Sequence, residues 1–242
     1  MSTLDGNHPG TNQLLAALEP QDRQVLAPHL ERVQLARREV LFEAGDELRH
    51  VWFPESCVVS LAVTMRDGGS SDAATIGREG MVGLMAAVSS HLALSRGVVQ
   101  MPGSALRLPA SVLKVLFEAS PPARQRCLCY VDALLAQVLQ SSACGALHSV
   151  EARLCRWLLQ LEDRTEGNPR LPLTHDFLAE MLGAHRTTVT LAARVLQRSR
   201  LIAYRRGQIR VLDRTGLENA ACECYGTIRE HYERLLPRRA RS

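Results

Sequence analysis

An arginine with short polar neighbours stands in the C-terminal third of the chain. Arg186 follows His185, and Thr187 and Thr190 lie just beyond it. A guanidinium carries five N–H donors in a rigid fork and can bond O6 and N7 of guanine together, while threonine can bond bases or phosphates. These residue types therefore suit contact with duplex DNA. The predicted contact residues are Thr174, His185, Arg186, Thr187, Thr190, Leu191, Arg194, Arg205 and Arg206.

The surrounding residues predict two short helices joined by a tight turn. Thr174 can cap a helix over 175–182 because its hydroxyl can accept a free N–H of the first turn. Gly183 can supply the positive φ that ends such a helix. Ala179 is small enough for two helices to cross at its position. This is the helix-turn-helix pattern, and it predicts a recognition helix over 185–199. The residues predicted to be buried on that helix are Val189, Ala192, Val195 and Leu196.

A basic hairpin is predicted next. "LIAYRRGQIRVL" (201–212) alternates, turns at Arg206-Gly207 and returns as a second strand. From Thr174 onward the chain has 13 arginines and 7 acidic residues, whereas the preceding part has 16 basic and 18 acidic residues. A basic end suits a polyanion, although charge alone would also fit a solvated face. Arg205, Arg206 and Arg210 are expected near phosphates, where they would add sequence-independent affinity.

The first half of the chain has a different pattern. Between 33 and 108, short apolar runs alternate with Gly-rich turns such as Gly68-Gly69, which predicts an antiparallel β-roll or jelly roll. The predicted fold class is α+β: a β domain over 1–120, a long dimerisation helix over 121–145, and a winged helix-turn-helix with a C-terminal helix over 146–242. The dimerisation helix carries an apolar and small-residue stripe, which predicts a homodimer, with packing inside one chain as the alternative. The stripe is Leu128, Val131, Leu135, Val138, Ser142 and Gly145.

Composition predicts a cytoplasmic protein that does not contact a membrane. Apolar residues make up 46% and charged residues 22% of the 242 residues, as in ordinary soluble domains. No uninterrupted apolar run approaches the ~18 residues of a membrane span. The opening "MSTLDGNHPGTNQ" has neither the basic nor the apolar region of a signal peptide.

The seven cysteines do not predict a metal site. None forms a C-x-x-C pair. The pairs Cys127/Cys129 and Cys222/Cys224 fall on apparent helices, where residues two apart point in different directions. The segment that contains Cys222 and Cys224 is predicted to be amphipathic, with one face running from Leu217 to Leu235. Most cysteines are therefore expected to be small buried residues, with a redox role as the alternative for the remainder, and neither metal ligands nor catalytic residues are predicted.

The whole arrangement resembles the Crp–Fnr family of bacterial transcription regulators. The resemblance is strongest in "VEARLCRWLLQ" (150–160) and "LTHDFLAEMLGAHRTTVTLAARVLQRSRLI" (173–202), and weaker in "VLFEAGDE" (40–47) and "GREGMVGLM" (77–85). It implies a cyclic-nucleotide-binding-like β-roll as sensor, a dimer on an inverted-repeat operator, and RNA polymerase as a partner. Arg186 matches a base-contacting arginine of the family. Thr187 and Leu191 replace two others, so the operator sequence is not carried over.

The same resemblance places a tentative effector pocket in the β-roll. Cyclic-AMP-binding members carry an F-G-E-L segment, whose glutamate holds the ribose, and a later R-S-A segment, whose arginine holds the phosphate. Here the first reads Val82-Gly83-Leu84-Met85, and the arginine of the second is shifted to Arg96. Losing the ribose carboxylate predicts that cyclic AMP is not bound in the usual manner. The predicted pocket residues are Gly80, Val82, Gly83, Leu84, Ser95 and Arg96, and the effector is unidentified.

Other sensing and catalytic chemistries are disfavoured. Residues 1–56 contain no cysteine, so the iron–sulfur cluster of the oxygen-sensing branch is not expected. His50 and His91 are the candidate haem ligands, but isolated histidines are more often structural. A cupin-like metal enzyme, the remote alternative, needs clustered histidines and carboxylates, and the β-region has no H-x-H pair. The nearer alternative is a regulator that binds DNA constitutively through a degenerate sensor.

Overall fold

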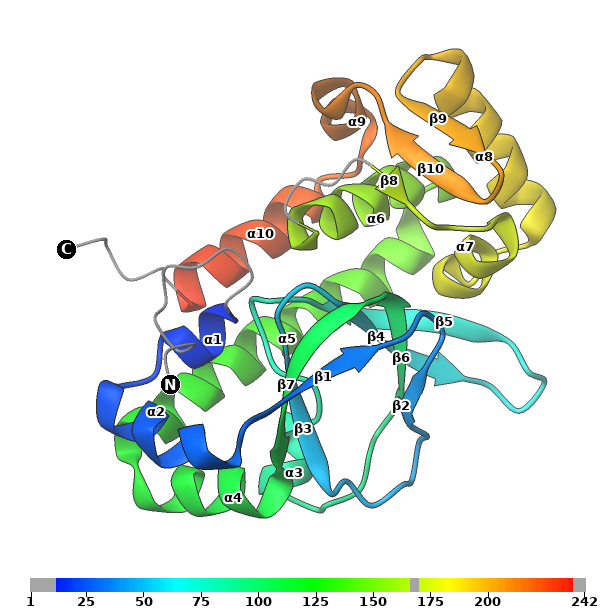
Figure 1. Ribbon diagram of the computed structural model, residues 1–242. Coiled ribbons are helices and arrows are strands. Elements are labelled where there is room, and N and C mark those ends of the chain that lie inside the picture. The colour runs from blue at the N-terminus through cyan, green and yellow to red at the C-terminus, as the bar shows by residue number, and fades with distance from the viewer. Residues whose placement is uncertain (1–11, 166–169, 237–242) are drawn as a thin grey trace. The chain divides into compact units, whose positions relative to one another are not determined.

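The apolar runs of the first half form two antiparallel sheets (Figure 1), as predicted. One sheet has the order β1–β7–β3, with β1 at Glu31–Leu35, β7 at Gly103–Pro109 and β3 at His50–Pro54. The other has the order β2–β6–β4–β5, with strands Val40–Phe42, Arg96–Met101, Val58–Thr64 and Ser70–Ile76. Gly68, with φ +88°, lies in the turn between β4 and β5, where the sequence predicted a hairpin tip.

Two apolar clusters hold this region together. One contains side chains from both sheets, among them Phe42, Trp52 and Val99, and the Phe42 and Trp52 ring centroids are 6.0 Å apart. The other joins β3 and β7 to short helices and to α5. These helices are α1 (Gln13–Ala16), α2 (Pro20–Leu26), α3 (Leu84–Val88) and α4 (Ala110–Ala119). Burial of these apolar surfaces is the main free energy that stabilises the roll.

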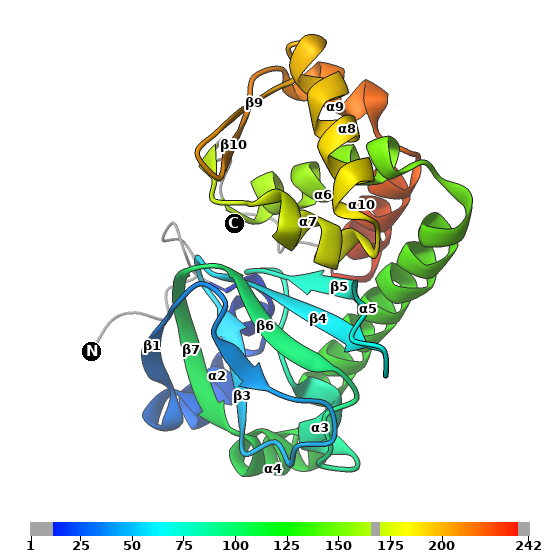
Figure 2. The same ribbon diagram turned by 90° about the vertical axis from the view of Figure 1, so that its right-hand side faces the viewer.

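The long helix α5 extends from Pro121 to Leu147, and Figure 2 shows it as one continuous helix. One side of it is buried; Tyr130 is fully covered and its hydroxyl donates to the Met81 carbonyl at 2.9 Å. Of the predicted dimerisation stripe, Leu128 is 44% and Leu135 is 52% exposed. Val131 and Val138 are half-buried, and Val131 packs against the second cluster, so only part of the stripe is open to a partner.

Helix α5 is also long and apolar enough to cross a membrane by length and composition, although no such segment was predicted. Its alanines, cysteines and leucines give it a high mean hydropathy, although polar residues interrupt every apolar run. Of its most apolar 18 residues, 28% are buried. An apolar surface of this kind is also expected on a soluble helix that packs against a second subunit.

The computed structural model describes residues 12–165 and 170–236, which form two compact units. The first contains described residues 12–61, 75–135 and 231–236, and the second contains 62–74, 136–165 and 170–230. The second unit is built around α6 (Val150–Arg164), in which Leu154, Trp157 and Leu158 are buried. Around it lie β8 (Arg170–Leu171), α7 (His175–Leu182), α8 (Arg186–Arg198), β9 (Ile202–Arg205), β10 (Gln208–Val211), α9 (Arg214–Ala220) and α10 (Cys224–Leu235).

The C-terminal segment differs from the sequence interpretation. The amphipathic pattern from Leu217 to Leu235 predicted one helical face, but the chain forms two helices, with extended backbone at Ala221. Cys222 lies in the break and Cys224 begins α10. The prediction that these two cysteines point apart on one helix was therefore wrong, because the helical spacing on which it depended does not exist there.

Candidate nucleic-acid interface

The predicted helix-turn-helix is present, and local interactions define its turn. Helix α7 has the predicted bounds, and the Thr174 hydroxyl accepts from the Phe177 N–H at 3.3 Å. Gly183 has φ +55°, the left-handed conformation that ends the helix. Helix α8 starts at Arg186, one residue after the predicted start, and His185 is its N-cap residue. The sequence prediction of both helices is confirmed.

Helix α8 buries a regular stripe against α6 and α7. Val189 and Ala193 are fully buried, and Leu196 is 1% exposed. Val195, however, was predicted to be buried and is 42% exposed, so that prediction was wrong. The buried residues follow the i, i+3, i+4, i+7 pattern from Val189. Val195 is at i+6, about 120° away from Val189 around the helix axis, and therefore lies outside the buried stripe.

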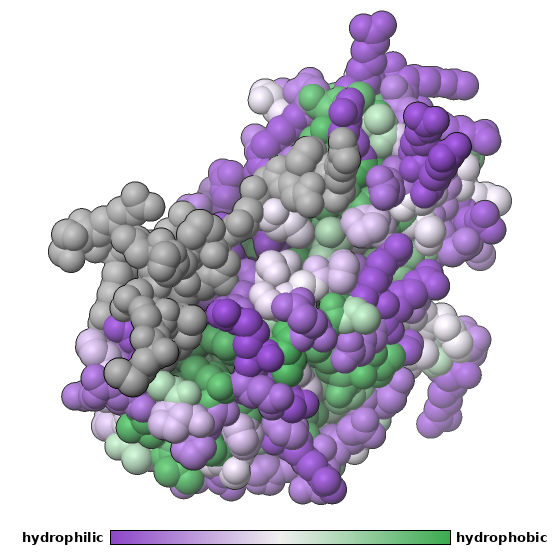
Figure 3. Space-filling model, in the orientation of Figure 1, coloured by the Kyte–Doolittle hydropathy of each residue, from purple (hydrophilic) through white to green (hydrophobic). Residues whose placement is uncertain are grey.

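The opposite face of α8 is exposed and mostly polar, with Leu191 and Val195 as its exposed apolar residues. Arg186 lies at its N-terminus, and its Nε is 3.1 Å from Asp176 Oδ1, with the two side chains 67% and 61% exposed. An ion pair so open to water contributes little stability, so Arg186 can leave Asp176 for another anion at a small cost in free energy. The surface over α8 and the neighbouring strands is mainly hydrophilic in Figure 3. The other exposed predicted contact residues are His185, Thr187, Leu191 and Arg194.

A histidine that the sequence analysis did not select joins three parts of this interface. The His175 ring stacks on Tyr204 of β9, with centroids 4.2 Å apart, and its Nδ1 is 3.1 Å from the Thr190 hydroxyl of α8. Thr190, a predicted DNA contact, is therefore half-buried and already hydrogen-bonded. Burial, followed by the charge of Arg186, lowers the pKa of His175, which favours its neutral form. His175 thus fixes the position of α8 relative to the hairpin.

The predicted wing is formed by β9 and β10. Its turn contains Arg206 at φ 51° and Gly207 at φ 74°, as a two-residue hairpin turn requires. Strand β10 is central in the sheet β8–β10–β9, and its Ile209 is fully buried. Arg205 and Arg206 are both exposed at the tip of the wing. The hairpin therefore presents two cations on a strand pair anchored by its apolar side.

An ionic network anchors the C-terminal helices of this unit. Arg214 at the start of α9 donates to Glu162 at 2.8 Å and to Asp163 at 2.7 Å, both on α6. It also donates to Glu218 and to the Tyr225 hydroxyl, which in turn donates to Asp163 at 2.9 Å. Glu162 has only 7% of its side chain exposed, so removing Arg214 would leave a buried carboxylate without this ion pair. The network fixes α9 and α10 on α6.

The residues predicted for an effector pocket lie in several different packing environments. The Val82 side chain belongs to the cluster with Trp52 between the sheets, whereas Leu84 packs in the other cluster, which includes Leu108. Arg96 has its Nε 3.2 Å from Glu43 Oε1, Ser95 is half-buried, and Gly83, at φ +92°, precedes α3. A side chain at Gly80 would overlap the Tyr130 ring. Arg96, the cation of the predicted pocket, is thus paired with a carboxylate, and the apolar members Val82 and Leu84 pack in different clusters.

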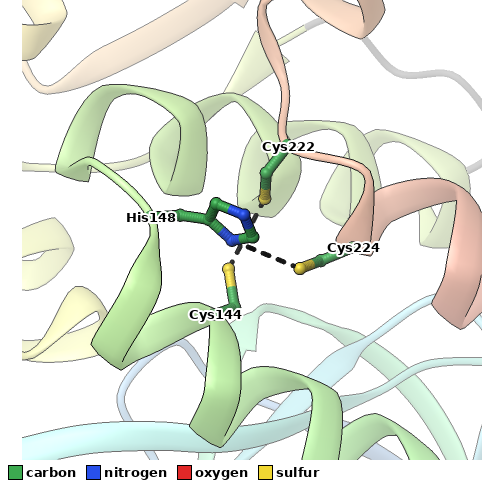
Figure 4. Close-up of side chains that lie close together, drawn as sticks. All are labelled: Cys144, His148, Cys222 and Cys224. Carbon is green, nitrogen blue, oxygen red and sulfur yellow. Dashed lines mark hydrogen bonds between the residues drawn. The ribbon is translucent and has the colours of Figure 1, made fainter.

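A cluster of sulfur and nitrogen atoms was missed by the sequence analysis. Cys144, His148, Cys222 and Cys224 point toward one another (Figure 4), and their ligand atoms all lie within 4.8 Å of one another. A hydrogen bond with Cys222 lowers the pKa of Cys144 well below its usual range and raises that of Cys222. The spacing Cys144-x-x-x-His148 at the end of a helix, where i and i+4 share a face, was the available signal. The expectation of no metal-ligand set is revised accordingly.

Two family models match separate regions of the chain. Residues 152–220 match the Crp-like helix-turn-helix domain, and residues 32–120 match the cyclic nucleotide-binding domain. A search of curated proteins finds no significant match. The two matched regions correspond to the winged unit and the β-roll, and neither indicates an enzyme.

Solved structures show the same fold at low sequence identity. A Crp/Fnr-family regulator from Eubacterium rectale is 18% identical with a TM-score of 0.67, over 86% of this chain and 96% of that one. FixK2 from Bradyrhizobium japonicum is 15% identical (TM-score 0.69; 80% and 98%). The c-di-GMP-responsive regulator CLP from Xanthomonas campestris is 18% identical (TM-score 0.65; 81% and 100%). With its nucleotide-binding-type β-roll, long helix and winged helix-turn-helix, this chain belongs to the Crp–Fnr family of DNA-binding transcription regulators.

Proposed function

We propose that two copies of this chain bind an inverted-repeat operator, each inserting α8 into the major groove. The observation that carries the proposal is the amphipathic division of α8: its apolar stripe is buried while Arg186 and Arg194 are exposed. An arginine at the N-terminal end of such a helix is placed to bond guanine. Arg205 and Arg206 of the wing would contact phosphates and add salt-dependent affinity.

The exposed stripe of α5 supports the homodimer. Leu128 and Leu135 of the stripe are 44% and 52% exposed, and Leu139, which was not part of the predicted stripe, is 62% exposed. The small residues Ser142 and Gly145 continue the stripe toward the helix end. A second α5 with the same stripe would remove these side chains from water at about 25 cal/mol per Å² of buried apolar surface. A dimer would also cover the apolar surface of α5 in a regulator that works in the cytoplasm. RNA polymerase is a further proposed partner.

Cyclic AMP is not the proposed effector. The leucine at position 84 packs into the core instead of offering a carboxylate, and Arg96 faces Glu43. Binding a cyclic phosphate at Arg96 would require breaking that ion pair, and the ribose would meet apolar groups. Calorimetric titration with cyclic AMP should give no binding in the micromolar range. The same titration should be made with c-di-GMP, because the structurally similar regulator CLP responds to it.

The packed β-roll favours a second candidate, in which the sensor no longer binds a ligand and DNA binding is constitutive. Phe42 and Trp52 contribute to the cluster between the sheets, where Gly97 lies directly against the Phe42 ring. The two candidates differ in one measurement. Adding a small-molecule extract of the source cells to purified protein should change DNA affinity if an effector exists, and should leave it unchanged if binding is constitutive.

The central proposal is tested by selecting binding sites from random duplex DNA with the purified protein. We expect enriched sequences to be inverted repeats whose half-site centres are one helical turn, about 34–36 Å, apart. Mass measurement of the complex should give two chains per duplex. Enrichment of no sequence, together with no affinity for duplex DNA at low salt, would refute the proposal.

A further inference from the structure

We propose that Cys144, His148, Cys222 and Cys224 form a structural site for one divalent zinc ion. Three thiolates and an imidazole are a common ligand set for tetrahedral zinc. Three of the four side chains are buried, and they come from distant parts of the chain. Cys144 is in the last turn of α5, His148 lies just after α5, and Cys222 and Cys224 flank the start of α10 (Figure 4).

The separations match a tetrahedral ion. Zinc–sulfur bonds of about 2.3 Å and zinc–nitrogen bonds of about 2.0 Å place tetrahedral ligands about 3.8 Å apart for two sulfurs and about 3.5 Å for sulfur and nitrogen. Cys144 Sγ and Cys222 Sγ are 3.5 Å apart, and Cys224 Sγ is 3.5 Å from His148 Nδ1. All four ligand atoms lie within 4.8 Å of one another, so the space between them suits a single ion.

The surroundings of the cluster supply an independent argument. His148 Nε2 is 3.2 Å from Glu223 Oε1, on the side of the ring away from Cys224. A carboxylate on the second nitrogen is the usual partner of a zinc-bound histidine, because it keeps the proton there and leaves the lone pair of the first nitrogen for the metal. Gln140 Nε2 donates to Cys224 Sγ at 3.0 Å, a bond that a thiolate accepts well.

Nearby cations offset the charge of the loaded site. Three thiolates, a neutral imidazole and Zn²⁺ together carry one negative charge. Arg153 and Arg156 of α6 both interact electrostatically with Cys144. Arg153 also donates to the Gly145 carbonyl at 3.5 Å and to the Leu182 carbonyl, which ends α7 of the helix-turn-helix. The ion would thus fasten the end of α5 to the start of α10 beside the helices of the DNA-binding unit.

The test is metal loading of the full chain without DNA. Protein prepared under reducing conditions, stripped of metal and titrated with Co²⁺, should bind one ion per chain. The spectrum should show thiolate-to-cobalt charge transfer and the strong visible bands of a tetrahedral site, and one equivalent of Zn²⁺ should abolish both. At 100-fold saturation, Zn²⁺ should raise the melting temperature by roughly 5–10 °C.

Single substitutions inside and outside the cluster test which side chains bind the ion. Cys144→Ser should abolish the charge-transfer bands, and Glu223→Gln should weaken zinc affinity about 10- to 100-fold. Cys129→Ser, on the same helix but outside the cluster, is the matched control and should bind as the wild type does. The proposal is overturned if the wild type binds no metal at micromolar concentration, if Co²⁺ binds without thiolate bands, or if Cys144→Ser binds normally. A Cys144–Cys222 disulfide in protein taken directly from cells would also overturn it.

Discussion

Replacing Arg186 with alanine separates sequence-specific contact from general charge. The Arg186–Asp176 pair is 3.1 Å long with both side chains more than half exposed, so its loss should change the free energy of unfolding by less than about 1 kcal/mol. A bidentate arginine–guanine contact discriminates by about 1–3 kcal/mol, which corresponds to roughly 5- to 150-fold in affinity. Arg186→Ala should therefore weaken operator binding by this factor while the protein remains folded.

The assay is fluorescence anisotropy with the selected operator and with operators changed at each base pair. Arg186→Ala should lose discrimination at one position in each half-site and keep it elsewhere. Arg198→Ala removes the same charge from the last turn of α8 and should weaken all duplexes alike. Arg206→Ala should reduce the slope of log affinity against log salt by about one. If Arg186→Ala weakens every duplex equally while the wild type discriminates among them, α8 does not contact bases through Arg186.

Three further predictions concern assembly and stability. Leu135→Glu should convert the dimer to a monomer in analytical ultracentrifugation, whereas Val115→Glu, at an exposed apolar position of α4, should not. A dimeric Leu135 variant would exclude the α5 interface. Arg214→Met should lower the free energy of unfolding, measured in urea, by about 2 kcal/mol. This loss is smaller than for a fully buried ion pair because Arg214 is 39% exposed. An unchanged midpoint of urea unfolding would show that Glu162 needs no partner. Since the pKa of His175 is lowered in the folded protein, the unfolded state binds its proton first, and stability should fall as pH drops below about 6.5. His175→Phe should flatten that dependence between pH 7.5 and 5.5, and an identical slope in both proteins would contradict it.

The sequence alone determined the helix-turn-helix because its signals are local. The Thr174 cap, the left-handed Gly183 and the apolar spacing of α8 each act over a few residues, and the structure has α7 at the predicted bounds. The positive-φ turn at Arg206-Gly207 is equally local. Backbone hydrogen bonds and steric limits at such positions depend little on the rest of the chain, so residue type and spacing were sufficient.

Tertiary structure decided which distant side chains meet. The sequence gives no measure of the distance between Cys144 and Cys222, which are 78 residues apart, and a helical pattern at Cys222 suggested the wrong geometry. The engagement of Thr190 by His175 likewise required α8, α7 and β9 to be packed together. Such contacts depend on how several elements bury their apolar faces at once, a collective property that short-range periodicity does not contain.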